Sequence, residues 1–335
     1  MPTKSARRIA KTHSILALFA LGIVILLLTL FQAIKLTQTF FSPWQTSHDR
    51  GYRWNGDFNI NFIIRSKSIS LVSYSPKNQN IIIINIPDET YIEVAHGFGN
   101  WQLRSIYGLG GAQLLKDSLI SFFALPIDGF LDFSGEFSQK EPNEIVSEFR
   151  KNPATLFGIL PSVKTDLTLF EMIRLKMGLS SVRFDKINKI DLSLANVLEK
   201  RFLADSTQVY IADSIKLNSL YTNLADPTIT SEHKTIAVFN ATDHPNLAQK
   251  AARLISNIGG DVIIVSNSEK RLDKTQILGE QSKTKVRLKQ IFIENGKQSL
   301  PFSDEKRKIE PNLEGLASSR AQIDLFLGED YFNSF

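Results

Sequence analysis

Two acidic residues follow a strongly apolar run in the stretch "IIIINIPDETYIEV", residues 81–94. Residues 81–86 are almost all isoleucine, which is typical of a central strand covered on both faces. Asp88 and Glu89 come directly after this run, where a buried strand delivers side chains to the rim of its sheet. We therefore expect Asp88 and Glu89 either to be functional groups that act on a bound molecule, or to have replaced functional residues that once stood at these positions.

Other kinds of chemistry are restricted by residue type. The 335-residue chain has no cysteine, which excludes disulfides and thiolate metal sites. The "GLGG" at residues 108–111 could cradle a phosphate at a helix N-terminus, but it lacks the full dinucleotide spacing, so a tight turn is the better interpretation. No serine lies in a nucleophile-elbow pattern. The histidines are scattered without an i, i+4 pair, which argues against a histidine metal site: His13, His48, His96, His233 and His244.

The N-terminus combines a basic tail with a long apolar segment. The tail is rich in Lys and Arg, has no acid, and precedes apolar residues 15–34. About twenty helical residues, at roughly 1.5 Å each, cross a bilayer core of about 30 Å, and the basic flank stays in the cytoplasm. We predict a cytoplasmic tail at 1–13, a transmembrane signal anchor at 14–36 and a linker at 37–56. The alternative, a cleaved signal peptide, has a shorter apolar core and a small-residue cleavage site, which "FQAIKLTQTF" does not offer.

Residues 57–230 are expected to form an α/β layered domain with a central mixed sheet. "FNINFII" (58–64), "SISLVSY" (68–74) and "IIIINI" (81–86) are strand patterns. "GLGG" is a turn pattern that leads into a helix, and Thr168 with Glu171 forms a capping box for a helix that Gly178 would end. Strands that alternate with helices indicate an α/β fold.

A second, smaller α/β domain is expected at residues 234–332. "TIAVFNAT", "HPNLAQKAARLISNIGG" and "DVIIVSN" predict a strand, a helix and a strand, and "QIDLFLGEDY" predicts a further strand. The helix would pack Leu254 against the strands that carry Val238 and Ile263. A unit of about 100 residues is a common size for an autonomous domain, so we expect it to fold alone.

These stretches together resemble the LytR-CpsA-Psr (LCP) family of membrane-anchored enzymes of the bacterial envelope. The resemblance is carried by "RSKSISLVSYSPKNQNIIIINIPDETYIEV", "YGLGGAQLLKDSLISFFALPIDGFLDFSG" and "VKTDLTLFEMIRLKMGLSSVRFDKINKIDLSL". The second domain resembles the LytR C-terminal domain that follows the catalytic domain in many members. The resemblance implies transfer of a glycopolymer from a polyprenyl-pyrophosphate carrier to peptidoglycan, with arginines gripping the phosphates and carboxylates holding Mg²⁺.

This sequence departs from the family's pattern at the residues that carry its chemistry. Lys67 stands where the family has an aspartate, two residues after the arginine matched by Arg65. Asp88 and Glu89 stand where the family has an arginine and an aspartate, and Arg104 lies in a region that also differs. The arginine-rich helix of the family has no counterpart here except Arg150. Two charge reversals in one pocket argue for altered chemistry, since a unit charge at contact contributes several kcal/mol even at an effective dielectric near 20.

Two interpretations follow. In the first, the protein is a non-catalytic, single-pass cell-envelope protein, with its C-terminal domains extracytoplasmic, that binds a polyprenyl-linked or wall glycopolymer, peptidoglycan or an envelope partner. No cofactor or metal is then expected. In the second, a rebuilt site is an active glycopolymer phosphotransferase, in which Arg65, Lys67 and Arg104 hold phosphate and Asp88 or Glu89 binds Mg²⁺. A nucleic-acid partner is not expected, because part of the net charge of +5 lies in the basic tail. Convergence of Lys67, Arg104 and Asp88 on one apolar-walled cavity would favour the second.

Overall fold

The structure, a computed structural model, describes residues 21–24, 26–29, 51–152, 155–294 and 319–332. The chain divides into two compact units, Met1–Thr46 and Ser47–Phe335. In the first unit, residues 21–24 and 26–29 are helical. The basic tail and most of the anchor expected at 14–36 lie outside the described residues. Among the residues that are described, no helix has the length and apolar character needed to cross a membrane.

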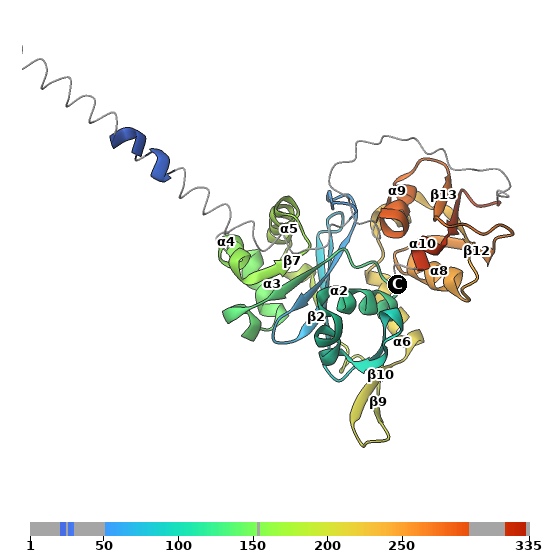
Figure 1. Cartoon of the computed structure of the whole chain (residues 1–335), viewed down its shortest axis with the longest axis horizontal. Coiled ribbons are helices and arrows are strands. Elements are labelled where there is room, and N and C mark those ends of the chain that lie inside the picture. Colours follow the sequence, from blue (N-terminus) through green and yellow to red (C-terminus); the bar gives the residue numbers. More distant parts are fainter. Residues whose placement is uncertain (1–20, 25, 30–50, 153–154, 295–318, 333–335) are drawn as a thin grey trace, which may run out of the picture. The chain divides into compact units, whose positions relative to one another are not determined.

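A mixed six-stranded sheet forms the centre of the second unit, as far as it is described, in the order β7-β6-β1-β2-β3-β8 (Figure 1). Its strands are β1 (Ile60–Arg65), β2 (Ile69–Ser75), β3 (Asn80–Ile86), β6 (Gly129–Phe133), β7 (Val163–Thr165) and β8 (Ile187–Asp191). Strand β2 is antiparallel to both β1 and β3, while β6 is parallel to β1 and β8 is parallel to β3. The carboxyl ends of β1, β3, β6 and β8 therefore meet along one edge, which we call the rim.

Helices cover both faces of this sheet, and the alternation of side chains along each strand explains how. On one face, Ile63 and Ile84 belong to a core that includes Leu115 and Leu119 of α2 (Leu103–Phe123). On the other face, Phe62 packs toward α3 (Pro142–Lys151), α4 (Thr155–Ile159) and α5 (Leu169–Ser181). The α/β layered domain predicted from the sequence is thus confirmed as a mixed α/β fold.

Two predicted helix boundaries are wrong, and packing explains both. Helix α2 begins at Leu103, ahead of the glycines, and breaks at Gly110 and Gly111 rather than starting after them. Helix α5 continues past Gly178 to Ser181. A Cβ at Gly178 would lie 2.5 Å from the Tyr74 hydroxyl, so this glycine permits close packing inside a helix instead of ending it.

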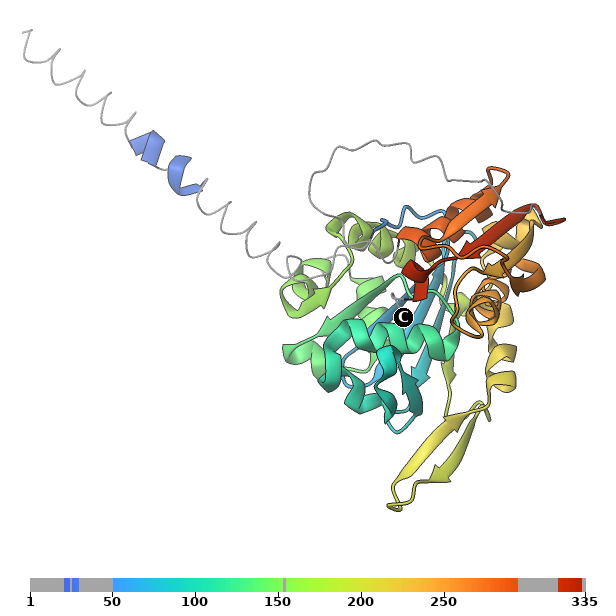
Figure 2. The ribbon, with the colours of Figure 1, turned by 45° about the vertical axis from the view of Figure 1, so that its right-hand side comes forward.

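Two antiparallel hairpins and two short helices complete the larger part. The hairpins are β4 (Tyr91–Val94) with β5 (Gly99–Gln102), and β9 (Leu198–Phe202) with β10 (Gln208–Ala212). The helices are α6 (Ser214–Ser219) and α7 (Pro227–Glu232). Figure 2 shows that the β9–β10 hairpin projects away from the two sheets.

The C-terminal part contains the predicted strand–helix–strand unit. Strand β11 (Thr235–Asn240), helix α8 (Leu247–Asn257) and strand β12 (Asp261–Asn267) form it, with β11 parallel to β12. The described strands order as β12-β11-β14-β13, with β13 (Gln276–Gly279) and β14 (Ile323–Leu327). Helices α9 (Lys283–Lys289) and α10 (Glu329–Phe332) pack beside them. Leu254 and Val238 are buried as expected, but Ile263 is 48% exposed, because β12 is an edge strand.

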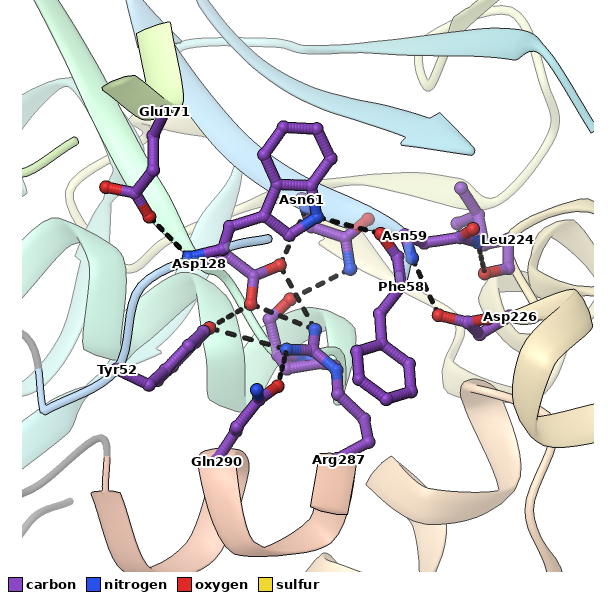
Figure 3. A network of polar contacts seen from close by, with 12 residues as sticks. Tyr52, Phe58, Asn59, Asn61, Asp128, Glu171, Leu224, Asp226, Arg287 and Gln290 are labelled. Atoms are coloured by element: carbon purple, nitrogen blue, oxygen red, sulfur yellow. Dashed lines mark hydrogen bonds and ion pairs between the residues drawn. The ribbon is translucent and has the colours of Figure 1, made fainter. Parts of the chain in front are cut away.

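A buried polar network connects the C-terminal part to the central sheet (Figure 3). Arg287 of α9 donates hydrogen bonds of 2.9 and 3.2 Å to the two carboxylate oxygens of Asp128. Asp128 lies just before β6 in the sequence. Asp128 also accepts a hydrogen bond from the backbone N–H of Asn61 at 2.8 Å and from the Tyr52 hydroxyl. Burial alone would lower the pKa of Arg287, but the Asp128 carboxylate and Tyr52 raise the pKa above its ordinary value. A single apolar core joins both sheets, because it includes Ile63 and Leu119 as well as Ile236 and Leu254.

Residues 51–59 pack along this junction. Tyr52 and Trp54 are 6% and 3% exposed. The Trp54 backbone N–H donates to Glu171 Oε1 of α5 at 2.6 Å, and the Asn59 N–H donates to Asp226 Oδ2 at 2.6 Å. The linker assigned to residues 37–56 therefore overlaps the folded unit at 51–56.

Candidate functional site

The rim of the central sheet brings together the residues singled out in the sequence. Arg65 is the last residue of β1 and pairs in register with Asp132 of β6 on one side and Ile69 of β2 on the other. Ile69 in turn pairs with Ile86, the last residue of β3. Asp88 and Glu89 follow within three residues, and Arg104 lies in the first turn of α2. The fold thus places Arg65, Asp88, Glu89 and Arg104 at one edge.

Arg65 is held by an aspartate and a tyrosine. Its guanidinium forms an ion pair with Asp132 and lies 3.7 Å from the centre of the Tyr107 ring. The Tyr107 hydroxyl donates to Asp132 Oδ2 at 2.5 Å. Burial raises the pKa of Tyr107, and the Asp132 carboxylate raises it further, so this hydroxyl stays protonated. The Arg65 guanidinium thus contacts the Asp132 carboxylate and the face of the Tyr107 ring, and a bound phosphate would have to compete with both contacts.

Lys67 pairs with Glu141, the residue that caps α3. The Lys67 Nζ lies 2.9 Å from Glu141 Oε1, and both side chains are more than one-third exposed, at 59% and 37%. Ser68 Oγ donates to Glu141 Oε2 at 2.9 Å. The hydrogen bond to Lys67 lowers the pKa of Glu141 and raises the pKa of Lys67. The exposure of this pair means that it contributes little to stability.

The turn between β3 and α2 presents Asp88 and Glu89. Thr90 fastens this turn, because its hydroxyl donates to the Pro87 carbonyl at 2.6 Å and its carbonyl accepts from the Leu103 N–H at 2.8 Å. Burial raises the pKa of the Asp88 carboxyl, and the neighbouring Glu89 charge raises it further, while Arg104 acts in the opposite direction. The Arg104 backbone N–H donates to the Asp88 carbonyl at 3.2 Å, so Arg104 lies beside this acidic turn.

Two carboxylates at the rim were missed by the sequence interpretation. Asp132 lies 67 residues from Arg65 in the sequence and becomes its partner through the parallel pairing of β1 and β6. The acidic residue within the apolar strand pattern "GFLDF" was the available signal. Glu141 begins the stretch "EPNE", in which Glu141 and Glu144 form a capping box, and that pattern was also readable.

Two cavities lie on the α3–α5 face of the sheet. The first is an apolar space of about 10 Å³ between Phe62, Leu131 and helices α3 to α5, about the room that one water molecule needs. The second is a cleft of about 300 Å³ between α3 and strands β3 and β8. Among the described residues, Arg150 Nε and Asn143 Oδ1 have no hydrogen-bond partner, and both residues line this cleft. None of Arg65, Lys67, Asp88, Glu89 or Arg104 lines either cavity.

The carboxylates do not gather into a larger metal-binding group. Within residues 51–152, 155–294 and 319–332, no three His, Asp or Glu side chains form a group that could hold a metal ion. Mg²⁺ is often held by one or two carboxylates together with substrate phosphates and waters. Asp88 and Glu89 therefore fit Mg²⁺ only where a bound phosphate supplies further oxygen ligands.

Comparisons with known proteins agree with the resemblance. Residues 234–331 match the family model described as LytR cell envelope-related transcriptional attenuator. The chain is 27% identical over 70 residues to a polyisoprenyl-teichoic acid–peptidoglycan teichoic acid transferase, TagU, of Halalkalibacterium halodurans, covering 21% of this chain and 23% of that protein. The chain thus spans about a quarter of this curated relative. These two matches support a similarity to LCP-family proteins, with residues 234–331 similar to the LytR C-terminal family.

Similar solved structures include three at low sequence identity. The TagV structure from B. subtilis is 14% identical, with a TM-score of 0.42 over 51% of this chain and 97% of that chain. A structure described as a transcriptional regulator from Enterococcus faecalis is 11% identical, with a TM-score of 0.41 over 62% of this chain and 91% of that chain. TagT, from B. subtilis, with bound octaprenyl pyrophosphate lipid is 12% identical, with a TM-score of 0.38 over 53% and 95%.

Proposed function

We propose that this protein is a single-pass cell-envelope protein that binds a polyprenyl-linked or wall glycopolymer without transferring it. The observation that carries the proposal is the charge balance at the rim. The three cations singled out in the sequence, Arg65, Lys67 and Arg104, stand beside four carboxylates, which are Asp88, Glu89, Asp132 and Glu141. Holding a pyrophosphate for transfer is favoured by an excess of positive charge and by guanidinium groups that are free to bind its oxygens. Among these seven described residues the carboxylates outnumber the cations, and Arg65 already has a carboxylate partner.

The same rim suits an uncharged or weakly charged polymer. Exposed pairs such as Lys67–Glu141 offer donors and acceptors that can exchange partners with sugar hydroxyls at low cost. The cleft along α3 adds an unpaired donor and an unpaired acceptor, Arg150 Nε and Asn143 Oδ1, within the described part of the chain. A buried polar atom without a partner carries a desolvation cost that a bound hydroxyl can relieve. We infer that a polymer segment lies along α3 between the rim and this cleft.

The test separates binding from transfer. Full-length protein in detergent is mixed with a polyprenyl-pyrophosphate-linked glycopolymer, peptidoglycan and Mg²⁺. The expected result is retention of polymer on the protein with no polymer attached covalently to peptidoglycan. The double variant Arg65→Ala/Lys67→Ala should weaken retention, whereas Lys200→Ala, at an exposed lysine of the β9–β10 hairpin, should not. Covalent attachment that Asp88→Asn abolishes would overturn the proposal.

The alternative is an active phosphotransferase with a rebuilt site, and one observation favours it. Burial raises the pKa of the Asp88 carboxyl, and the negative charge of Glu89 raises it further, a repulsion that a divalent cation would relieve. Asp88 and Glu89 would then hold Mg²⁺, which would neutralise charge on a phosphate bound by Arg65, Lys67 and Arg104.

Metal binding distinguishes the two proposals. A ligand that binds the native state alone raises stability by RT ln(1 + [L]/Kd). On the non-catalytic proposal, Mg²⁺ leaves the melting temperature of the full-length protein unchanged in differential scanning fluorimetry. A saturable increase that is lost in Asp88→Asn and in Glu89→Gln would instead support the phosphotransferase.

The proposed location is the cytoplasmic membrane, with one helix at residues 14–36 and the domains outside the cytoplasm. The basic tail and the apolar residues 15–34 support it. A reporter fused after Phe335 that is active only outside the cytoplasm should give a signal, and a cytoplasm-specific reporter should not. The opposite pattern would contradict the proposed topology.

A further inference from the structure

Helix α5 is apolar on both of its faces. Its inner face buries Met172, Leu175 and Leu179, which are at most 1% exposed. Its outer face carries Phe170 at 78% exposure, Met177 at 69% and Ile173 at 36%. The outer three lie at positions i, i+3 and i+7, so they form one stripe along the helix. An apolar stripe that the described chain leaves uncovered indicates a surface with a partner.

The charged side chain on the stripe's own face of the helix is a cation. Arg174 lies on the same outer face, four residues after Phe170, and is exposed. The acid of this helix, Glu171, is 2% exposed and accepts hydrogen bonds from the Trp54 N–H and from Thr168. The outer face of α5 therefore presents apolar side chains and an arginine, but no carboxylate from the helix itself. Such a face is typical of helices that lie in the interface of a bilayer.

Helix α5 also holds the segment through which the chain reaches its N-terminal part. Trp54 accepts a hydrogen bond through its carbonyl oxygen from Arg174 at 2.9 Å, and its N–H donates to Glu171 at 2.6 Å. Gly51 is three residues before Trp54, and residues 37–50 can span at most about 50 Å when fully extended. A domain tethered this closely to a bilayer experiences an effective concentration of order mM toward it.

We propose that the outer face of α5, formed by Phe170, Ile173 and Met177, docks on the bilayer that holds the anchor. Arg174 then lies among anionic headgroups while its methylene groups stay in the apolar layer. Docking would fix the orientation of the rim relative to the membrane. The inference rests on the proposed anchor at 14–36.

The absence of cysteine from the sequence permits a direct test, because each introduced cysteine is the single labelling site. Full-length protein is reconstituted in vesicles of phosphatidylethanolamine and phosphatidylglycerol, with a nitroxide at Phe170→Cys or Met177→Cys. Val24→Cys reports on the anchor, and Lys200→Cys on the projecting hairpin is the exposed control. Collision with oxygen, which concentrates in the bilayer, is compared with collision with a water-soluble nickel chelate.

The labels at 170 and 177 are expected to favour oxygen, as the label at 24 does, while the label at 200 favours the nickel chelate. If the label at 177 favours the nickel chelate, as the label at 200 does, while the label at 24 favours oxygen, the docking proposal is overturned but the anchor is supported. If the label at 24 also favours the nickel chelate, the proposed membrane anchor is contradicted as well. Shielding of 177 from both reagents would mean that a second copy of the chain or another protein covers α5, which also overturns the proposal.

A second variant checks the driving force. Phe170→Ser combined with Met177→Ser removes two exposed apolar side chains and should leave the melting temperature unchanged, because neither side chain is buried. Losing the burial of both should reduce the ratio of docked to free domain roughly 100-fold. A nitroxide at Ser181→Cys should then change from oxygen-accessible to nickel-accessible. An unchanged signal at 181 would contradict the proposed role of the stripe.

Discussion

The negative charge of the Asp88 carboxylate lowers the stability of the folded protein. Burial raises the pKa of its carboxyl, with Glu89 adding to the effect. A carboxyl with a raised pKa in the folded state binds protons more tightly than in the unfolded state, so its stabilising contribution falls as the pH rises through this range. The Asp88→Asn variant does not titrate. We predict that it is more stable than the parent protein at pH 7, by roughly 0.5–2 kcal/mol.

The pH dependence of this difference provides the measurement. Thermal unfolding of both proteins is followed from about pH 3.5 to pH 7.5, a range that begins near the ordinary pKa of Asp. The gain should be smallest at the acid end, where Asp88 is mostly protonated in both states, and should grow to a plateau above the folded pKa. The exposed Glu93→Gln serves as the matched control and should show no such growth. A gain that is constant across the range would contradict the electrostatic explanation.

Part of the rim could be predicted from the sequence. The end of an apolar run located Arg65, Asp88 and Glu89 at strand ends, because a strand's carboxyl end lies where its pattern stops. The partners of Arg65 could not be predicted, since Asp132 becomes its neighbour only through the parallel pairing of β1 with β6. Such a pairing depends on which strands adjoin, and no local pattern encodes that. The charge balance of the rim therefore required the fold.

Helix α2 is interrupted by Gly110 and Gly111, which have different structural roles. Gly111 has a φ of 71° and a ψ of −159°, a backbone conformation that is essentially restricted to glycine, and a Cβ there would meet no atom within 4 Å. A Cβ at Gly110 would lie 2.6 Å from the Leu114 side chain. Gly108, three residues before Gly111, has space for a Cβ and no such backbone constraint. The break separates the rim-facing first turns, with Arg104 and Tyr107, from the buried second part.

We predict that Gly111→Ala lowers the free energy of unfolding by about 1–3 kcal/mol, the cost of holding a residue with a Cβ in a backbone conformation that glycine alone adopts readily. The matched variant Gly108→Ala should be neutral or should stabilise by about 0.5–1 kcal/mol, because alanine suits a helix interior better than glycine. Urea unfolding of both variants measures the difference. Equal effects at the two positions would show that the break in α2 does not exist in solution.

Element boundaries were harder to predict than elements. The capping box at Thr168 and Glu171 correctly located the start of α5, because it depends on two residues three apart. The predicted end of α5 at Gly178 was wrong. A glycine can also occur inside a helix where a neighbouring side chain leaves no room for a Cβ. Here the Tyr74 ring occupies that space, and Tyr74 is more than 90 residues away in the sequence. Long-range packing therefore overrode a local stop signal.

The whole molecule depends on how the C-terminal domain joins the central sheet. The sequence predicts a boundary near residue 234 and a domain that folds alone. The structure adds a buried ion pair across that boundary, with the side chains of Arg287 and Asp128 3% and 0% exposed. Removing one member of such a pair leaves an uncompensated buried charge, which costs about 3–5 kcal/mol. The pair thus couples the two parts whether or not each can fold by itself.

Arg287→Met tests that coupling and the domain boundary together. In the parent protein we expect one thermal transition, because the apolar core that includes Ile63 and Ile236 is continuous. In the variant, the buried Asp128 carboxylate loses the guanidinium of Arg287 but keeps its hydrogen bonds from Tyr52 and the Asn61 N–H. The junction is then destabilised, and the C-terminal domain should unfold in a transition separate from the larger part. Lys289→Met removes the same charge from the same helix, and Lys289 has no carboxylate ion-pair partner among the described residues, so this variant should keep one transition. Scanning calorimetry distinguishes the outcomes: a single transition in Arg287→Met at a lower temperature would mean that residues 51–332 form one cooperative unit, and that the boundary at 234 separates two sequence families but not two folding units.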